Sequence, residues 1–313
     1  MSGLSKALIS LILLLPLGAN SAVHQDELPD GTKWYLHADL KQMRESSSGR
    51  ELYNWMDDEI FIEIHDEVGI DVSKEADRLT AFSSLDQGTI VVVEGNISKE
   101  SQDKVLALAA AEAKLDTRAH KGKTYFHVQH ADRAGHPEIN DGNGNSALDD
   151  LDEEAFFSFA IKNKLIVASS DRQMQAMLDS AGRVAGSPAR GGALFVLTAD
   201  KTFVQAGLNT SDLPDEEGGW QSNIIRNTEQ IALLVSESKD HIAIEAQLVS
   251  ADPRMAESIG GIINGLISLQ AFNSELDPEL QALLQSTKIL VNDKVLSIST
   301  VISQKTIVKV LKD

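Results

Sequence analysis

The segment WYLHADL (34–40) returns later in the chain as FVLTADK (195–201), with Leu-x-Ala-Asp at the same place in both. Two further pairs of segments follow in the same order. RLTAFSSLDQGTIVVVEG (78–95) corresponds to QIALLVSESKDHIAIEAQL (230–248), and FSFAIKNKLIVASS (157–170) corresponds to KILVNDKVLSIST (288–300). Short apolar runs separated by turn residues predict antiparallel strands, and apolar residues at helical spacing lie between them. We therefore predict an α+β fold of two tandem pseudo-repeats, each a mainly antiparallel sheet with helices packed on one face.

The separation between matched residues changes along the chain, and the change locates an insertion. It is 161 positions from Leu36 to Leu197, but only 130 from Lys164 to Lys294. Most of the difference falls in the polar stretch 129–154, which has no counterpart in the second repeat. Inserted loops on a repeated scaffold are frequent carriers of function, so this stretch is the first place to look for a site.

The first 22 residues have the pattern of a secretory signal peptide. Lys6 precedes an apolar stretch, and cleavage after Ser21 or Ala22 satisfies the small-residue rule. The alternative, an uncleaved anchor, is disfavoured because the apolar run is short for a membrane span. We expect an exported protein, periplasmic or extracellular, organised as follows: a signal peptide (1–22), repeat 1 (23–182), a linker rich in small residues and proline (183–192), and repeat 2 (193–313).

Composition limits the partners and the chemistry. The chain has no cysteine, which excludes disulfides and thiolate sites. Its 47 acidic and 28 basic residues give a net charge of −19, which disfavours nucleic acid and anionic membrane surfaces as partners. No other segment is long and uncharged enough for a membrane helix, so we expect no membrane insertion after signal removal, and a monomer.

The polar insertion contains a candidate calcium loop. Oxygen ligands recur at relative positions 1, 3, 5, 9 and 12, a spacing that resembles the EF-hand loop. The sixth position is Ser146 instead of glycine, and no helices are predicted to flank the loop. The alternative is an ordinary solvated, turn-rich loop. The predicted ligands are Asp141, Asn143, Asn145, Asp149 and Asp152.

Histidines gather just before this loop. Two imidazoles and a carboxylate can hold zinc, but no H-E-x-x-H pattern is present. Solvated or locally bonded histidines are the favoured interpretation, with titration near neutral pH as a further possibility. The residues concerned are His120, His127, His130, His136 and Asp132.

A helix is predicted to begin at Pro253, with Asp252 as its N-cap. Gly261 and Gly265 within it form a G-x-x-x-G pattern. Because Glu257 and Asn264 lie in the same helix, we expect these glycines to pack closely against a sheet, and not to form a membrane dimer.

Several motifs resemble a known group of proteins. They are the strand that ends in Ala-Asp-Leu (38–40), Gly-Ile-Asp (69–71) leading to Asp-Arg-Leu-Thr (77–80), and the strand Val-Val-Val-Glu-Gly (91–95) followed by a helix. The chain resembles uncharacterised secreted bacterial proteins built from a duplicated α+β unit. The resemblance extends over most of the chain after the signal peptide and implies a fold and an export route, but no catalytic residues.

The sequence favours a non-catalytic function. Phosphate-loop, nucleophile-elbow and dinucleotide motifs are missing from the chain. We expect a cell-envelope protein that binds a protein or a small ligand and is stabilised by calcium. The alternatives are a metal- or carboxylate-dependent hydrolase with its site around residues 120–152, and a structural envelope component.

Overall fold

The computed structural model describes residues 28–29, 31–61, 70–84, 88–129, 154–184, 193–207, 224, 226–238, 241–271, 278–303 and 306. It is a mixed α+β protein whose strands pair antiparallel. The chain divides into two compact units. The N-terminal unit holds Gln25–Lys41 and Asn54–Pro188, and the C-terminal unit holds Ala189–Asp313 together with the early segment Gln42–Tyr53.

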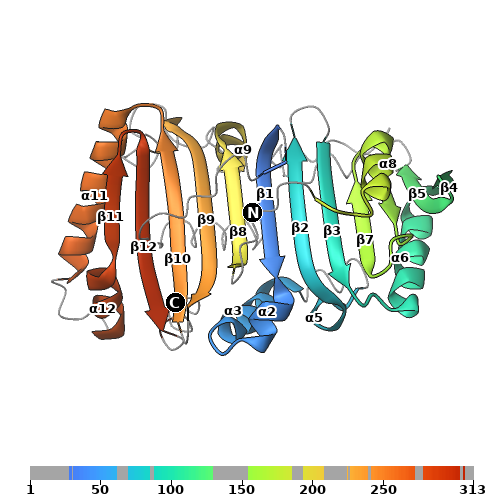
Figure 1. Ribbon diagram of the computed structural model, residues 1–313, viewed down its shortest axis with the longest axis horizontal. Coiled ribbons are helices and arrows are strands. Elements are labelled where there is room, and N and C mark those ends of the chain that lie inside the picture. The colour runs from blue at the N-terminus through green and yellow to red at the C-terminus, as the bar shows by residue number, and fades with distance from the viewer. Residues whose placement is uncertain are drawn as a thin grey trace. The chain divides into compact units, whose positions relative to one another are not determined.

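The N-terminal unit contains a sheet in the order β1-β2-β3-β7-β6-β5-β4, with each neighbouring pair antiparallel (Figure 1). Its strands are β1 (Thr32–Asp39), β2 (Ala76–Ser84), β3 (Gly88–Gly95), β4 (Lys114–His120), β5 (Lys123–Gln129), β6 (Glu154–Ser158) and β7 (Lys164–Ala168). Its helices are α5 (Val72–Glu75), α6 (Lys99–Glu112) and α8 (Asp171–Asp179).

The C-terminal unit contains a sheet in the order β8-β9-β10-β12-β11, also antiparallel throughout. Its strands are β8 (Ala193–Asp200), β9 (Thr228–Ser238), β10 (His241–Ser250), β11 (Lys288–Asn292) and β12 (Val295–Ser303). Its helices are α9 (Lys201–Gly207), α11 (Pro253–Ala271) and α12 (Pro278–Ser286). Helices α2 (Leu40–Glu45) and α3 (Gly49–Met56) and the π-helical turn η2 (Asp57–Phe61) follow β1 in the sequence. Their residues Gln42–Tyr53 belong to the C-terminal unit, and the others belong to the N-terminal unit.

Polar side chains cap the N-termini of three helices, and Asp252 was the cap predicted for α11. The Ser98 and Ser170 hydroxyls accept hydrogen bonds from the third backbone N–H of α6 and α8, at 3.1 and 3.3 Å. The Asp252 carboxylate accepts one from Met255 at 3.0 Å and begins α11 with Pro253 in its first position. Each such cap satisfies a backbone donor that the helix itself leaves without a partner.

Helices pack on both faces of the N-terminal sheet, so the prediction of one covered face is wrong for this unit. Leu165 belongs to a buried cluster that packs against Val105 and Leu106 of α6. Its neighbour Ile166 points to the other face of the strand. An added Cβ on Gly182, just after α8, would lie 3.2 Å from Ile166. The consecutive apolar residues of β7 are therefore buried on both sides.

The prediction that Gly261 and Gly265 of α11 pack closely against a sheet is also wrong. An added Cβ on Gly261 or Gly265 would meet no atom within 4 Å. The glycine that packs against the sheet is Gly260, where an added Cβ would lie 2.8 Å from Val291. No helix within the described ranges is long and apolar enough to cross a membrane.

Candidate functional site

Four charged residues of the N-terminal unit stand directly opposite one another on four neighbouring strands. Asp39 of β1 pairs with Arg78 of β2, Arg78 pairs with Glu94 of β3, and Glu94 pairs with Lys164 of β7. Residues opposite each other in antiparallel strands point to the same face, so these side chains form a row that runs across the sheet. Negative and positive charges alternate along this row. We call it the charged row.

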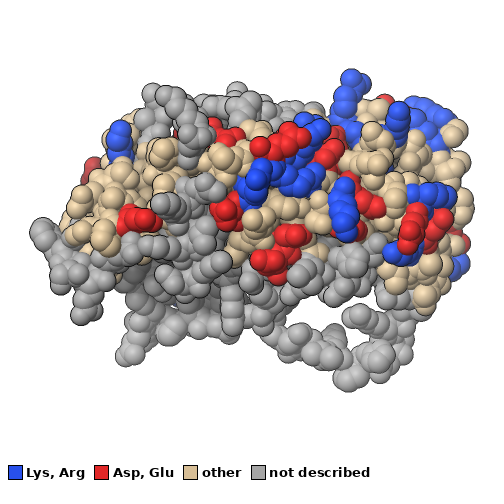
Figure 2. Space-filling view, turned by 90° about the horizontal axis from the view of Figure 1, so that it is seen from below, with Lys and Arg blue, Asp and Glu red and all other residues tan. Residues whose placement is uncertain are grey.

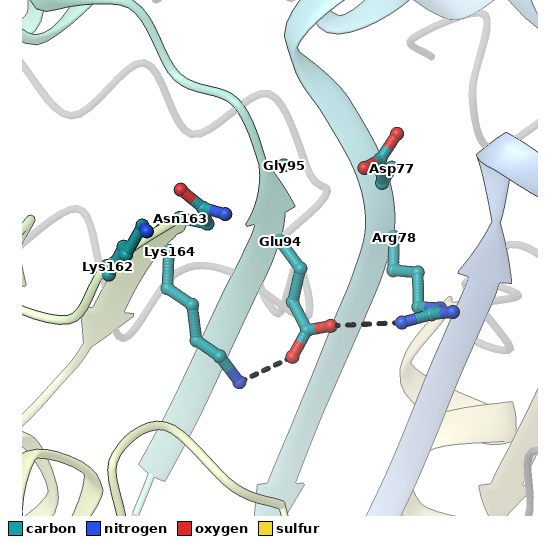
Figure 3. Close-up of a pocket in the computed structure, with 7 residues that line it drawn as sticks. All are labelled: Asp77, Arg78, Glu94, Gly95, Lys162, Asn163 and Lys164. Carbon is teal, nitrogen blue, oxygen red and sulfur yellow. Dashed lines mark hydrogen bonds and ion pairs between the residues drawn. The ribbon is translucent and has the colours of Figure 1, made fainter.

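Each side chain of the charged row contacts its neighbour in the row, and Figure 3 shows the contacts of Glu94 with Arg78 and Lys164. The Arg78 Nε donates to Asp39 Oδ2 at 3.0 Å, and its Nη1 lies 3.5 Å from Glu94 Oε2. The Lys164 Nζ donates to Glu94 Oε1 at 2.5 Å and to the Gly182 carbonyl at 2.9 Å. The hydrogen bond to Asp39 raises the pKa of the Arg78 guanidinium further above its usual value. Arg78 therefore carries its positive charge at neutral pH.

A polar hollow of about 210 Å³ opens beside this row. Three cationic side chains line it, and Lys162 is the one among them that forms no hydrogen bond or ion pair with other described residues. The hollow is smaller than the ~300–1,000 Å³ typical of sites for drug-sized molecules, so it suits a small polar ligand. The lining residues are Asp77, Arg78, Glu94, Gly95, Lys162, Asn163 and Lys164.

Two backbone features shape the hollow. The backbone at Gly95 lies so close to the end of α5 that an added Cβ would be 2.0 Å from the Glu75 carbonyl oxygen. Asn163 occupies the left-handed region, with φ of 61°, in the turn between β6 and β7. Its carbonyl accepts a hydrogen bond from the Gly95 N–H at 2.9 Å. This bond ties the turn that carries Lys162 to the end of β3.

His37 is buried two residues before Asp39 on the same face of β1. Its Nδ1 lies 2.8 Å from the Thr80 hydroxyl. Burial lowers the pKa of His37, because it disfavours the charged imidazolium, and Asp39 opposes this effect while Arg78 adds to it. A neutral imidazole therefore lies near the charged row.

A second polar cluster centres on His127 of β5. The ring is buried and stacks on Phe156, with centroids 4.4 Å apart. Its Nδ1 lies 2.7 Å from Arg118 Nη2, and its Nε2 lies 2.5 Å from Glu154 Oε1. Since a guanidinium only donates, Nδ1 must accept, and the proton of the ring sits on Nε2. Both ring nitrogens are thus engaged, which leaves His127 without a free nitrogen for a metal or a substrate.

The same cluster fastens α8 to the sheet. Asp171 Oδ1 accepts hydrogen bonds from the Tyr125 hydroxyl at 2.8 Å and from Arg118 at 3.0 Å. Partial burial raises the pKa of Asp171, but these hydrogen bonds outweigh it, and the net shift is downward. Burial, followed by the hydrogen bond to Asp171, raises the pKa of Tyr125. The cluster holds structure together and presents no activated nucleophile.

The predicted calcium ligands Asp141, Asn143, Asn145, Asp149 and Asp152 lie outside the described residues, as do His130, His136, Asp132 and the proposed signal peptide. The Nε2 of His120 lies 3.0 Å from Asp179 Oδ1, whereas the ring nitrogens of His127 contact Arg118 and Glu154, so the two histidines have different partners. Within the part of the chain that the structure describes, no group of three His, Asp or Glu side chains could hold a metal ion.

Sequence reasoning missed the charged row. Its four members lie far apart in the chain, and only the strand register brings them together. On the face of the molecule in Figure 2, basic side chains lie directly beside acidic ones. The net charge of the sequence does not say where basic side chains lie, so it could not indicate the three cationic side chains that line the hollow.

Comparisons with known proteins find distant likenesses to solved structures of TP0453. No family model matches the chain, and no curated protein does. Crystal forms III and IV of TP0453 each superpose with a TM-score of 0.46 at 10% identity, and cover 94% and 97% of this chain and 98% and 99% of that one. Crystal form I gives a TM-score of 0.42, again at 10% identity, over 91% of this chain and 95% of that one. These scores are too low to support an argument about function.

Proposed function

We propose that this is an exported, non-catalytic binding protein of the cell envelope, which holds a small anionic ligand in the hollow beside the charged row. The observation that carries the proposal is the gathering of Arg78, Lys162 and Lys164 around one hollow of a chain with a net charge of −19. Cations on a half-enclosed surface raise the local concentration of anions. A carboxylate or phosphate group is the chemistry that such side chains recognise.

The contacts give each cation a different part in binding. Glu94 holds Arg78 and Lys164 in place through both of its oxygens. Lys162 is exposed, and its ammonium group forms no hydrogen bond or ion pair with the described residues. The ligand therefore meets Lys162 first, and the Asn163 amide and the outer edge of the half-exposed Arg78 complete its contacts.

The lining chemistry supports binding over catalysis. The seven lining residues include no hydroxyl, imidazole or thiol that could act as a nucleophile or neutral base. Both carboxylate oxygens of Glu94 already contact cationic side chains, one Arg78 and the other Lys164. A ligand held there keeps its covalent structure.

We also propose that the two units are copies of one ancestral α+β unit. In support, the order β1-β2-β3-β7-β6 in the N-terminal unit matches β8-β9-β10-β12-β11 in the other, with β5 and β4 added at one end. The row that begins at the matching Asp200 continues through Gln230, Val249 and Val295. The C-terminal copy thus carries one charge where the N-terminal copy carries four, which favours a site in the N-terminal unit alone.

Titration calorimetry tests the ligand class, with inorganic phosphate and succinate as probes. We expect at least one of them to bind, and Lys162→Gln to weaken that binding about tenfold, as expected for one lost charge-assisted hydrogen bond. Lys99→Gln is the matched control, because Lys99 is an exposed lysine of α6 paired with Asp103. Absence of binding by the parent to either probe, or equal loss in both variants, would refute the anion site.

A further inference from the structure

The outer edge of β11 is an open strand edge. In the described part of the chain β11 pairs with β12 alone, from Lys288 opposite Ser299 to Asn292 opposite Val295. Leu290 and Val291 of this strand are 53% and 38% exposed. A strand edge with apolar side chains and unpaired backbone groups is a template for the addition of another strand.

The edge strand of the other unit is built differently. β4 carries Lys114, Asp116, Arg118 and His120 at alternate positions, and such charges discourage pairing with another chain. The strand that matches β11 under the proposed duplication is β6, and β6 is not an edge. It pairs with β5 on its far side, where Phe157 stands opposite Phe126. Among the described residues, no strand lies beside β11 in the position that β5 occupies beside β6.

We infer that a second copy of this chain fills that place, with the two β11 strands paired antiparallel about a twofold axis at Leu290. This register sets Leu290 opposite itself and Lys288 opposite Asn292, so no like charges face each other. A twofold axis uses the same edge on both copies and closes the assembly at two. This inference differs from the monomer expected from the sequence, because composition takes no account of strand edges.

Helix α11 covers one face of β11 beside this edge. It packs over β11, since Gly260 approaches Val291. A twofold axis perpendicular to the joined sheet places both α11 helices on the same side of it, so neither helix blocks the pairing of the two β11 strands from the opposite face.

Sedimentation velocity over a range of micromolar concentrations tests the dimer. We expect the parent protein to sediment with twice the mass of one chain, and Leu290→Lys and Val291→Lys to sediment as single chains with unchanged circular dichroism. Leu108→Lys is the matched control, at a similarly exposed leucine on α6 of the other unit, and should stay dimeric. A monomeric parent would overturn the inference, as would a dimer that survives both lysine variants or a monomer that co-sediments with phosphatidylglycerol vesicles.

The absence of cysteine allows a direct test of the register. Residues opposite each other in antiparallel strands lie within the Cα separation that a disulfide needs. Leu290→Cys should therefore cross-link two chains on mild oxidation, while Leu108→Cys should not. Equal cross-linking of the two variants would contradict the pairing of β11, whether or not the hollow binds an anion.

Discussion

At the scale of single residues, Gly95 shapes the hollow because nothing larger fits there. An added Cβ would lie 2.0 Å from the Glu75 carbonyl oxygen and 2.9 Å from the Asp77 nitrogen. We expect Gly95→Ala to lower the free energy of unfolding by about 1–3 kcal/mol, since the backbone must shift to relieve the overlap. Urea denaturation measures this. Gly261→Ala, which meets open space within a helix, is the control and should cost nothing; equal losses would contradict the close approach at Gly95.

His37 gives the fold a defined pH dependence. Burial lowers its pKa below the usual value of a histidine, so the unfolded chain binds the proton more readily than the folded one. The stability that this group contributes is complete above the unfolded pKa and is lost as the pH falls through the folded pKa. We expect His37→Asn to make the melting temperature less sensitive to acidification from about pH 7.5 to about pH 5.5. His241→Gln, at an exposed side chain, should keep the dependence of the parent; an unaltered slope in His37→Asn would count against the buried neutral imidazole.

At the scale of elements, α8 depends on the Asp171 carboxylate. Tyr125, Arg118 and Gln175 all donate to it. Because these bonds lower its pKa, Asp171 stabilises the fold above the unfolded pKa, and that stability is lost as the pH falls through the folded value. We expect Asp171→Asn to cost about 1 kcal/mol at neutral pH, a low value for a charged acceptor because the site is partly exposed.

The control for Asp171→Asn is Asp103→Asn, which breaks an exposed pair with Lys99 on α6. We expect it to cost less than about 0.5 kcal/mol. Chemical denaturation at neutral pH and at about pH 3.5 measures both. If Asp103→Asn cost as much as Asp171→Asn, the anchoring of α8 by this carboxylate would be wrong.

Most elements could be predicted from the sequence, because caps and turns act locally. Asp252 caps α11 as predicted, and Ser98 and Ser170 cap α6 and α8 in the same way. The elements predicted from the sequence do not include β4, although Lys121-Gly122 carries the two positive φ values of a tight hairpin turn, 47° and 79°. Polar residues alternate with less polar ones along 114–120, which is the pattern of a half-buried strand.

The candidate site could not be predicted, for a physical reason. The contact of Asp39 with Arg78 spans 39 positions, and that of Lys164 with Glu94 spans 70. Periodicity predicts that each residue lies on a strand, but a shift of one residue in register would move a side chain to the other face of the sheet. Only the pairing of all four strands places the charges in one row.

At the scale of the whole molecule, calcium binding by the 129–154 loop stays a prediction. We expect EDTA to lower the melting temperature and excess calcium to restore it, because an ion that binds the folded state alone stabilises that state. A variant with Asp141→Ala and Asp152→Ala should melt at the same temperature with and without the chelator. An unchanged melting temperature of the parent at millimolar calcium would contradict a bound ion.

The central claim is that the N-terminal unit binds a small anion beside the charged row, and native mass spectrometry of protein isolated gently from the cell tests it most directly. We predict a parent mass that exceeds the chain mass by one small molecule, which is released on acid denaturation, and a bare mass for Lys162→Gln. Lys99→Gln should retain the added mass. A bare parent, or an adduct carried equally by parent and Lys162→Gln, would contradict the claim.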